Sequence, residues 1–321
     1  MELRTWNFST DNHYIPSFLD GMSIAHHEPR RTEDWFHWKF EQSPYGPAIL
    51  ACAFEDDKVA GCVAFGKGKI KYRGEIRSCA LSYETFVHPD FQGRGLFKKL
   101  IKLVEAELLK EKVEFLYNFP NSNSLPGFSH MGWIIRNDLK SYKIHIARPV
   151  ASILNIRDIK KAFVPLNSNF TDILNTDLSK VIVDASIDDI VRPIWTKEYL
   201  KWRFFSFPNR NYHVINTDDY FAISMIGNRG KLKDAHLLYA VSKNANEKAS
   251  LYIPKILSQI KKEVKPHIIT YSSTICDDLL DNVGGFWKVP SHSNFCYKVL
   301  DESLTIEDLR IVLPSINAHT Y

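Results

Sequence analysis

The 321-residue chain has few of the features that mark disulfide-rich, metal-binding or membrane-spanning proteins. Its five cysteines form no C-x-x-C pair, which argues against a structural zinc site and a disulfide scaffold, and no metal is predicted. The longest apolar run, residues 48–54, is far shorter than the ~20 residues that cross a bilayer. Lys and Arg exceed Asp and Glu by only four, so neither a nucleic-acid partner nor a membrane partner is predicted.

Residues 1–13 are polar and of mixed charge, with no apolar stretch of the signal-peptide kind. Glycine and proline are not enriched and no low-complexity tract is present, which favours a globular protein. We therefore expect a cytoplasmic protein. The length predicts two globular units, each large enough to bury a core.

A short internal repeat indicates that the two units are related. Residues 35–40, Trp-Phe-His-Trp-Lys-Phe, align without a gap on residues 199–204, Tyr-Leu-Lys-Trp-Arg-Phe, and a proline follows each copy at the same spacing. We expect the matching Trp38 and Trp202 to lie in the two separate cores. Residues 165–169, rich in Pro, Asn and Ser, resemble a linker, and residues 151–163 are predicted to form a bridging helix.

After each copy of the repeat, the predicted elements follow one order: a hairpin, a strand, an amphipathic helix and a further strand. In the first half the strands are expected at 47–54, 59–65, 80–87 and 113–119, with the helix after Gly95. In the second half they are expected at 212–215, 220–226, 235–241 and 267–271, with the helix at 253–264.

Residues 84–97 are the most informative segment for function. A predicted strand is followed by a proline-marked turn and by a loop with Gly93 and Gly95, which opens the helix. Backbone N–H groups at such a helix start bind phosphate, and glycine lets a bulky anion approach the backbone closely. A Rossmann loop would need a third glycine where Lys98 stands, and the P-loop pattern is absent.

Gln92-Gly93-Arg94-Gly95-Leu96-Phe97 resembles the acyl-CoA motif [QR]-x-x-G-x-[GA] of the GNAT acyltransferase superfamily, with Phe97 where Gly or Ala is usual. Downstream, five residues fall on the spacing of the family's second motif, N-x-x-[AS]-x3-Y-x3-G-[FW]: Asn121, Ser124, Phe128, Gly132 and Trp133. The resemblance implies acetyl-CoA or another acyl-CoA as co-substrate.

The resemblance also implies a fold class. We expect an α/β protein of two tandem GNAT-like units, each a mixed, mostly antiparallel twisted sheet flanked by helices. Residues 1–148 would form the domain with the acyl-CoA loop. Residues 165–321 would form a degenerate domain that walls the acceptor site, because residues 242–247 contain no glycine and no Gln-x-x-Gly.

By this resemblance, the residues that bind the co-substrate are Phe86, Val87, Gln92, Gly93, Arg94, Gly95, Leu96, Phe97 and Asn121. A backbone N–H near Phe86 or Val87 would stabilise the oxyanion. The family's tyrosine, which often protonates the departing thiolate, is replaced by Phe128, which cannot donate a proton. Four nearby residues are candidate substitutes: Tyr117, Ser122, Ser124 and His130.

Transfer to an amine also requires a base that removes the ammonium proton. Glu84 is the first candidate, because it precedes the loop on the strand where GNAT enzymes often carry an acidic residue. Tyr83 is the second catalytic candidate. Strand alternation places these two side chains on opposite faces, so one of them is expected to face the cleft.

The function expected is therefore acyl-CoA-dependent N-acylation of a small acceptor, for which a nucleotide-linked (dTDP or UDP) amino sugar of surface polysaccharide is one candidate. One alternative is a peptidoglycan-bridge type transferase that uses aminoacyl-tRNA, against which the intact loop and the small net charge argue. Another is a non-catalytic CoA-binding protein. The acyl chain, the acceptor and the oligomeric state are not indicated.

Overall fold

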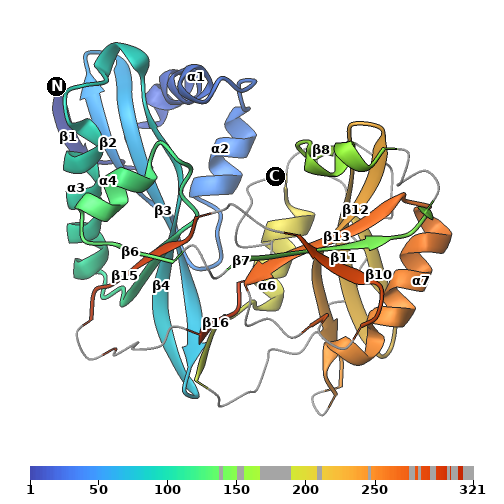
Figure 1. Cartoon of the computed structure of the whole chain (residues 1–321). Helices are drawn as coiled ribbons and strands as arrows, with labels where there is room; N and C mark the ends of the chain where they lie inside the picture. The colour runs from blue at the N-terminus through green and yellow to red at the C-terminus, as the bar shows by residue number, and fades with distance from the viewer. Residues whose placement is uncertain are drawn as a thin grey trace. The chain divides into compact units, whose positions relative to one another are not determined.

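The computed structural model describes residues 1–136, 140–149, 155–166, 189–207, 212–244, 247–274, 279–280, 283–289, 294–301, 304 and 310–313. The chain divides into two compact units (Figure 1). Unit 1 comprises residues 1–136, 193–208 and 293–308, and unit 2 comprises residues 137–192, 209–292 and 309–321. Both units contain a mixed sheet with helices, as expected for two tandem GNAT-like units.

The sheet of unit 1 has the strand order β1-β2-β3-β4-β5-β15-β6. These strands are β1 (Glu2–Thr5), β2 (Ile49–Glu55), β3 (Lys58–Tyr72), β4 (Glu75–Val87), β5 (Phe115–Asn118), β15 (Cys296–Val299) and β6 (Ile134–Ile135). The pairing is antiparallel throughout except between β4 and β5. The predicted hairpin of the strands expected at 47–54 and 59–65 is confirmed by the antiparallel pairing of β2 and β3.

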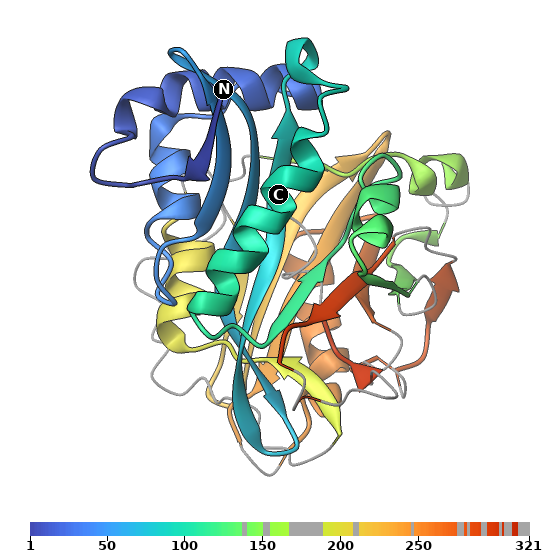
Figure 2. The same cartoon turned by 90° about the vertical axis from the view of Figure 1, so that its left-hand side faces the viewer.

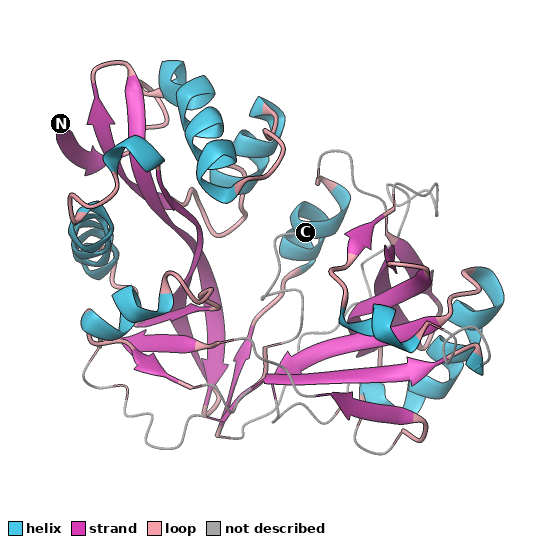
Figure 3. Ribbon diagram, turned by 45° about the horizontal axis from the view of Figure 1, so that its top comes forward, coloured by secondary structure: helices cyan, strands magenta, loops and turns pink. Residues whose placement is uncertain are grey.

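Helices cover both faces of this sheet (Figure 3). One face packs against α1 (Ile15–His26) and α2 (Glu33–Phe40), through a core that includes Phe18, Trp38 and Phe86. The other packs against α3 (Leu96–Lys110) and α4 (Leu125–His130). Figure 2 shows α3 lying across the strands. Its buried side chains are Leu96, Leu100, Ile101, Val104 and Leu108, and each fully buried apolar side chain there contributes about 1.5–3 kcal/mol.

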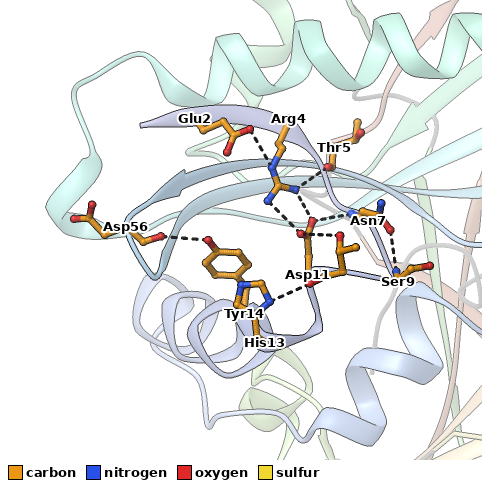
Figure 4. Close-up of polar contacts among 10 residues, drawn as sticks. Glu2, Arg4, Thr5, Asn7, Ser9, Asp11, His13, Tyr14 and Asp56 are labelled. Carbon is orange, nitrogen blue, oxygen red and sulfur yellow. Dashed lines mark hydrogen bonds and ion pairs between the residues drawn. The ribbon is translucent and has the colours of Figure 1, made fainter.

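The first strand is held by a polar cluster between β1 and the loop that follows it (Figure 4). Arg4 forms an ion pair with the buried Asp11, which also accepts a hydrogen bond of 2.8 Å from the backbone N–H of Asn7. The Arg4 guanidinium lies 4.0 Å from the centre of the Phe54 ring on β2. The cluster therefore fixes the edge strand to its neighbour and to the short helix η1 (Asn12–Tyr14) that leads into α1.

Unit 2 contains a seven-stranded sheet in the order β10-β11-β12-β13-β7-β14, with β8 pairing to β11. Its strands are β10 (His213–Asn216), β11 (Tyr220–Arg229), β12 (Leu232–Ser242), β13 (Ile268–Thr274), β7 (Lys140–Ile146), β14 (Phe286–Val289) and β8 (Val164–Pro165). Helix α7 (Ile253–Glu263) packs its predicted apolar stripe on the sheet. The short strands β9 (Ile190–Pro193) and β16 (Arg310–Ile311) pair in parallel.

Neither unit is a continuous stretch of chain. Strand β7, from the first half of the sequence, pairs with β13 and β14 in the sheet of unit 2. Strand β15, from near the C-terminus, lies between β5 and β6 in the sheet of unit 1. The units therefore differ from the predicted division at 1–148 and 165–321.

The segment between the predicted domains is only partly described. Residues 151–154 of the predicted bridging helix and 167–169 of the predicted linker lie outside the described residues. Residues 156–160 form the 3-10 helix η3 (Ile156–Lys160), and Pro165 ends β8.

The two repeat copies pack against each other inside unit 1, which corrects the expectation that Trp38 and Trp202 lie in separate cores. The second copy forms α6 (Lys197–Leu200) and the π turn η5 (Lys201–Phe205). The two indoles stack at 5.2 Å, and each indole N–H donates to the other tryptophan's carbonyl, at 2.9 and 2.8 Å. Both carbonyls lie in the last turn of their helix, where Glu41 and Gln42 donate to the carbonyl of His37 and Ser206 donates to that of Lys201.

Candidate active site

Residues 88–95, here called the β4–α3 loop, offer backbone N–H groups to solvent at the start of α3. Gly93 and Gly95 adopt left-handed φ values of +76° and +68°, and both are exposed. Within the described chain, no group accepts a hydrogen bond from the N–H of Gly93, Arg94 or Gly95. A Cβ at either glycine would meet nothing within 4 Å. The loop therefore has both the donors and the open space that an anionic group requires.

The side chains of this loop stabilise the loop itself. The Gln92 amide donates to the carbonyl of Val87 at 3.3 Å, which holds the loop against the end of β4. The Arg94 guanidinium donates to the carbonyl of Asp90 at 3.3 Å and lies 5.0 Å from the Phe91 ring centre. These contacts engage the two side chains within the loop, whereas the backbone N–H groups of Gly93, Arg94 and Gly95 have no acceptor among the described residues.

The two departures from the family motifs, Phe97 and Phe128, contact each other. Their rings pack edge to face at 5.3 Å, and a Cβ at Gly127 would lie 2.4 Å from the Phe97 ring. Phe128 is fully buried and also packs on Trp133 at 4.8 Å. The Phe97 ring is thus accommodated between α3 and α4, and Phe128 is a core residue of unit 1.

Asn121 begins the turn that leads into α4. Its side-chain oxygen accepts hydrogen bonds from the backbone N–H groups of Asn123 and Ser124, at 3.0 and 2.9 Å, and from the Ser124 hydroxyl. Asn121 is exposed, so its predicted contact with the co-substrate stays a prediction beside this structural role. Among the candidate acids, Tyr117 is buried and stacks on Phe115, whereas Ser122 and His130 are exposed.

A β-bulge on β4 changes the expected placement of Tyr83 and Glu84. Glu84 has a φ of +48°, and the β3–β4 register shifts between Cys62 and Ala64. A bulge inserts one extra residue and so breaks strict alternation. Both side chains consequently reach the same group, the amine of Lys39 on α2: Glu84 Oε1 lies 3.8 Å and the Tyr83 ring centre 4.3 Å from Nζ. The expectation of opposite faces was wrong at this point.

The bulge lies where β4 leaves its neighbour. Strand β4 pairs with β5 only from Cys79 to Leu81, although β4 continues to Val87. The end of β4 therefore runs beside β3 alone before it enters the β4–α3 loop.

Lys39 is a site residue that the sequence interpretation missed. Its side chain is 6% exposed, and that of Glu84 is 14% exposed. Burial lowers the pKa of Lys39 from 10.5 to about 7; Glu84 raises it, and the cations Arg203 and Arg31 lower it further. Burial raises the pKa of the Tyr83 phenol well above its ordinary value, and Glu84 adds to that effect, so Tyr83 stays neutral. The only sequence signal for Lys39 was its place in the repeat, opposite Arg203.

The corresponding loop of unit 2 follows β12, and the structure describes it except for residues 245–246. It leads through the 3-10 turn η6 (Ala249–Tyr252) into α7, with no glycine between Ser242 and α7. In the part of the chain that the structure describes, no three His, Cys, Asp or Glu side chains are grouped to hold a metal ion. No helix there is long and apolar enough to cross a bilayer.

A model of a known protein family matches the N-terminal part of the chain. Residues 10–135 match the model of an acetyltransferase (GNAT) domain. Solved structures with the same fold include a GCN5-related N-acetyltransferase from Anabaena variabilis, with a TM-score of 0.60, 10% identity, and 94% of this chain and 73% of that one covered. Eis1 from Mycobacterium abscessus gives a TM-score of 0.60 at 10% identity, covering 94% and 74%.

A third structure with this fold is N-myristoyltransferase from Saccharomyces cerevisiae with bound myristoyl-CoA. It gives a TM-score of 0.53 at 12% identity, covering 92% of this chain and 82% of that one. No curated protein matches the chain in sequence. Residues 10–135 thus match a GNAT acetyltransferase domain, and at these identities the structural likenesses establish the fold alone.

Proposed function

We propose that the protein is an acyl-CoA-dependent N-acyltransferase. Three features at one end of β4 support this: the bulge at Glu84, the loss of β5 pairing after Leu81, and the open N–H groups of the β4–α3 loop. The observation that carries most weight is the pair of left-handed glycines at the start of a 15-residue helix, because it suits a pyrophosphate. The family match over residues 10–135 agrees with this assignment.

In this proposal, a backbone N–H at Phe86 or Val87 stabilises the oxyanion of the thioester carbonyl. The loop residues Gln92 to Phe97 hold the CoA end and so fix the thioester carbon beside the bulge. Glu84 removes the proton that keeps the acceptor amine charged. Tyr83 contributes a neutral aromatic wall next to Glu84 and Lys39.

The acceptor is proposed to be the amine of a small molecule. A nucleotide-linked amino sugar remains the narrower proposal, and a panel of amines that includes dTDP- and UDP-linked amino sugars would test it by thiol release from acetyl-CoA. Release above background with any amine supports the transferase. Background release together with tight CoA binding would instead favour a non-catalytic CoA-binding protein. Phe128 suggests this alternative, because it is buried and cannot donate a proton.

The loop assignment is tested by replacing Gly95 with leucine. A Cβ there meets no protein atom within 4 Å, so the new side chain would occupy the space proposed for the pyrophosphate. We expect calorimetry to show CoA and acetyl-CoA binding weakened by at least about tenfold, or about 1.4 kcal/mol.

Gly132→Leu is the matched control, because Gly132 has a left-handed φ of +76°, close to the +68° of Gly95, and equally open surroundings. The backbone strain of a non-glycine residue is then similar in both variants. Equal CoA affinity in the Gly95 and Gly132 variants would contradict the assignment.

A further inference from the structure

We propose that Lys39 takes up the proton that leaves the acceptor amine before it passes to solvent, and that Glu84 transfers the proton to Lys39. The inference rests on the proposed function, since it concerns acyl transfer to an amine. It assigns a role to a buried helix residue that neither loop motif contains.

The amine of Lys39 lies close to the carboxylate of Glu84. Its Nζ lies 3.8 Å from Glu84 Oε1, and within the described residues Glu84 is the only carboxylate at ion-pair distance from it. The amine also faces two rings, with centres at 4.3 Å for Tyr83 and 5.8 Å for Trp38. The side chain of Glu84 is more exposed than that of Lys39, so a substrate amine meets Glu84 first.

The backbone holds this arrangement in place. Lys39 belongs to the last turn of α2, and its carbonyl accepts a hydrogen bond from the Tyr83 hydroxyl at 3.4 Å. The adjoining carbonyls of Trp38 and Phe40 accept from the Trp202 indole and from the N–H of Ala48. The end of α2 is thus fastened to the bulged strand and to η5 by separate contacts.

The charges around Lys39 favour its neutral form. From β4 it faces Glu84 and the neutral Tyr83, from η5 it senses Arg203, and from the segment before α2 it senses Arg31. Burial and the two cations outweigh the single carboxylate and bring the pKa of Lys39 to about 7. An amine of that basicity is well matched to accept a proton near neutral pH.

The proposed reaction moves one proton to Lys39 before the acyl group is transferred. The acceptor ammonium gives one proton to the Glu84 carboxylate, which passes it to the neutral Lys39 amine. The freed nitrogen lone pair attacks the thioester carbonyl, the carbon–sulfur bond breaks, and the departing thiolate takes the second N–H proton. Lys39 then releases its proton to solvent. Overall, an ammonium and an acyl-CoA give an amide, CoA thiol and one proton. Transfer between Glu84 and Lys39 needs their distance to close to about 3 Å.

The first experiment measures the titration of Lys39 without any substrate. The protein is labelled with 13C at the lysine ε-carbon, and the Lys39 signal is assigned by its loss in Lys39→Arg. We expect a midpoint near the pKa of about 7, and a lower midpoint in Glu84→Gln, which removes the carboxylate that favours the ammonium form. A midpoint near the ordinary lysine value would overturn the proposal.

The second experiment measures acetyl-CoA turnover against pH with an amine from the panel. Lys39→Met is expected to lower kcat by about 100-fold and to remove its rise between about pH 6 and pH 8, while CoA affinity stays within about twofold. Lys39→Arg is expected to remain equally impaired, because a guanidinium does not deprotonate. Recovery of activity in Lys39→Arg would mean that Lys39 is only a counter-ion and would refute the proposal.

Lys67→Met is the control for the loss of a lysine. Lys67 pairs with Glu111 at 2.8 Å on β3, outside the site, and we expect its variant to keep the wild-type profile. A wild-type profile in Lys39→Met would overturn the proton-holding role. Absence of CoA binding by the wild-type chain would instead refute the proposed function, and the titration of Lys39 would still be readable.

Discussion

At the scale of single residues, the site depends on the backbone of Glu84. The sequence marked Glu84 as the candidate base from its position before the loop, and the structure places it beside a buried amine. Strand alternation could not predict that Tyr83 would reach the same amine, because the bulge has no sequence signature here. The burial of Lys39 could not be predicted either, because a single lysine in a short helix is usually exposed.

Burial of Lys39 predicts a stability that depends on pH. Its pKa is about 7 in the folded chain and 10.5 ordinarily, so between these values the unfolded chain binds a proton that the folded chain does not. Stability therefore rises with pH across this window, by up to about 1.4 kcal/mol per unit. Lys39→Met should abolish this rise. Its free energy of unfolding should exceed that of the wild type by the largest amount below pH 7.

Urea unfolding at a series of pH values would measure this difference. The comparison is between the free energies of unfolding of Lys39→Met and the wild type, with Lys67→Met as the control for removing a lysine elsewhere in unit 1. If the difference in free energy of unfolding between Lys39→Met and the wild type is constant from acid to alkaline pH, the lowered pKa of Lys39 is contradicted.

At the scale of elements, the long periodic segments were predictable and the short ones were not. The α3 stripe, the hairpins and the strand before the β4–α3 loop follow from apolar periodicity and turn residues. The contact between Phe97 and Phe128 joins α3 to α4, which a spacing rule cannot reveal. The two departures from the family motifs are thereby explained by one packing arrangement.

This packing predicts that restoring the family's tyrosine does not restore its chemistry. Phe128 is fully buried between Phe97 and Trp133, so Phe128→Tyr would bury a hydroxyl in an apolar cluster. We expect a loss of about 1–3 kcal/mol in unfolding free energy, measured in urea, and no gain in turnover. Adding Phe97→Ala should lessen the cost of the tyrosine, because it opens space beside the hydroxyl. Increased turnover in Phe128→Tyr would contradict this account.

At the scale of the whole molecule, the exchange of strands makes the two units interdependent. Two related units were predictable from the repeat and from the order of elements. The exchange was not, because β15 is four residues long and its partner β5 lies far away in the sequence. The repeat also could not predict that its two copies pack against each other. Two segments with the same sequence pattern do not specify which sheet each of them will pack on.

The exchange predicts that residues 1–148 do not fold alone. That fragment would lack β15, which pairs with β5 and whose Lys298 binds Glu105 of α3 at 2.7 Å. It would also lack Trp202, the partner of Trp38, and would expose β7 without β13 and β14. Unpaired strand edges favour aggregation. We expect the fragment to lack a cooperative urea transition and to bind no CoA, and co-expression with residues 149–321 to restore both. A fragment 1–148 that unfolds cooperatively by itself would show that β15 and η5 are dispensable for unit 1.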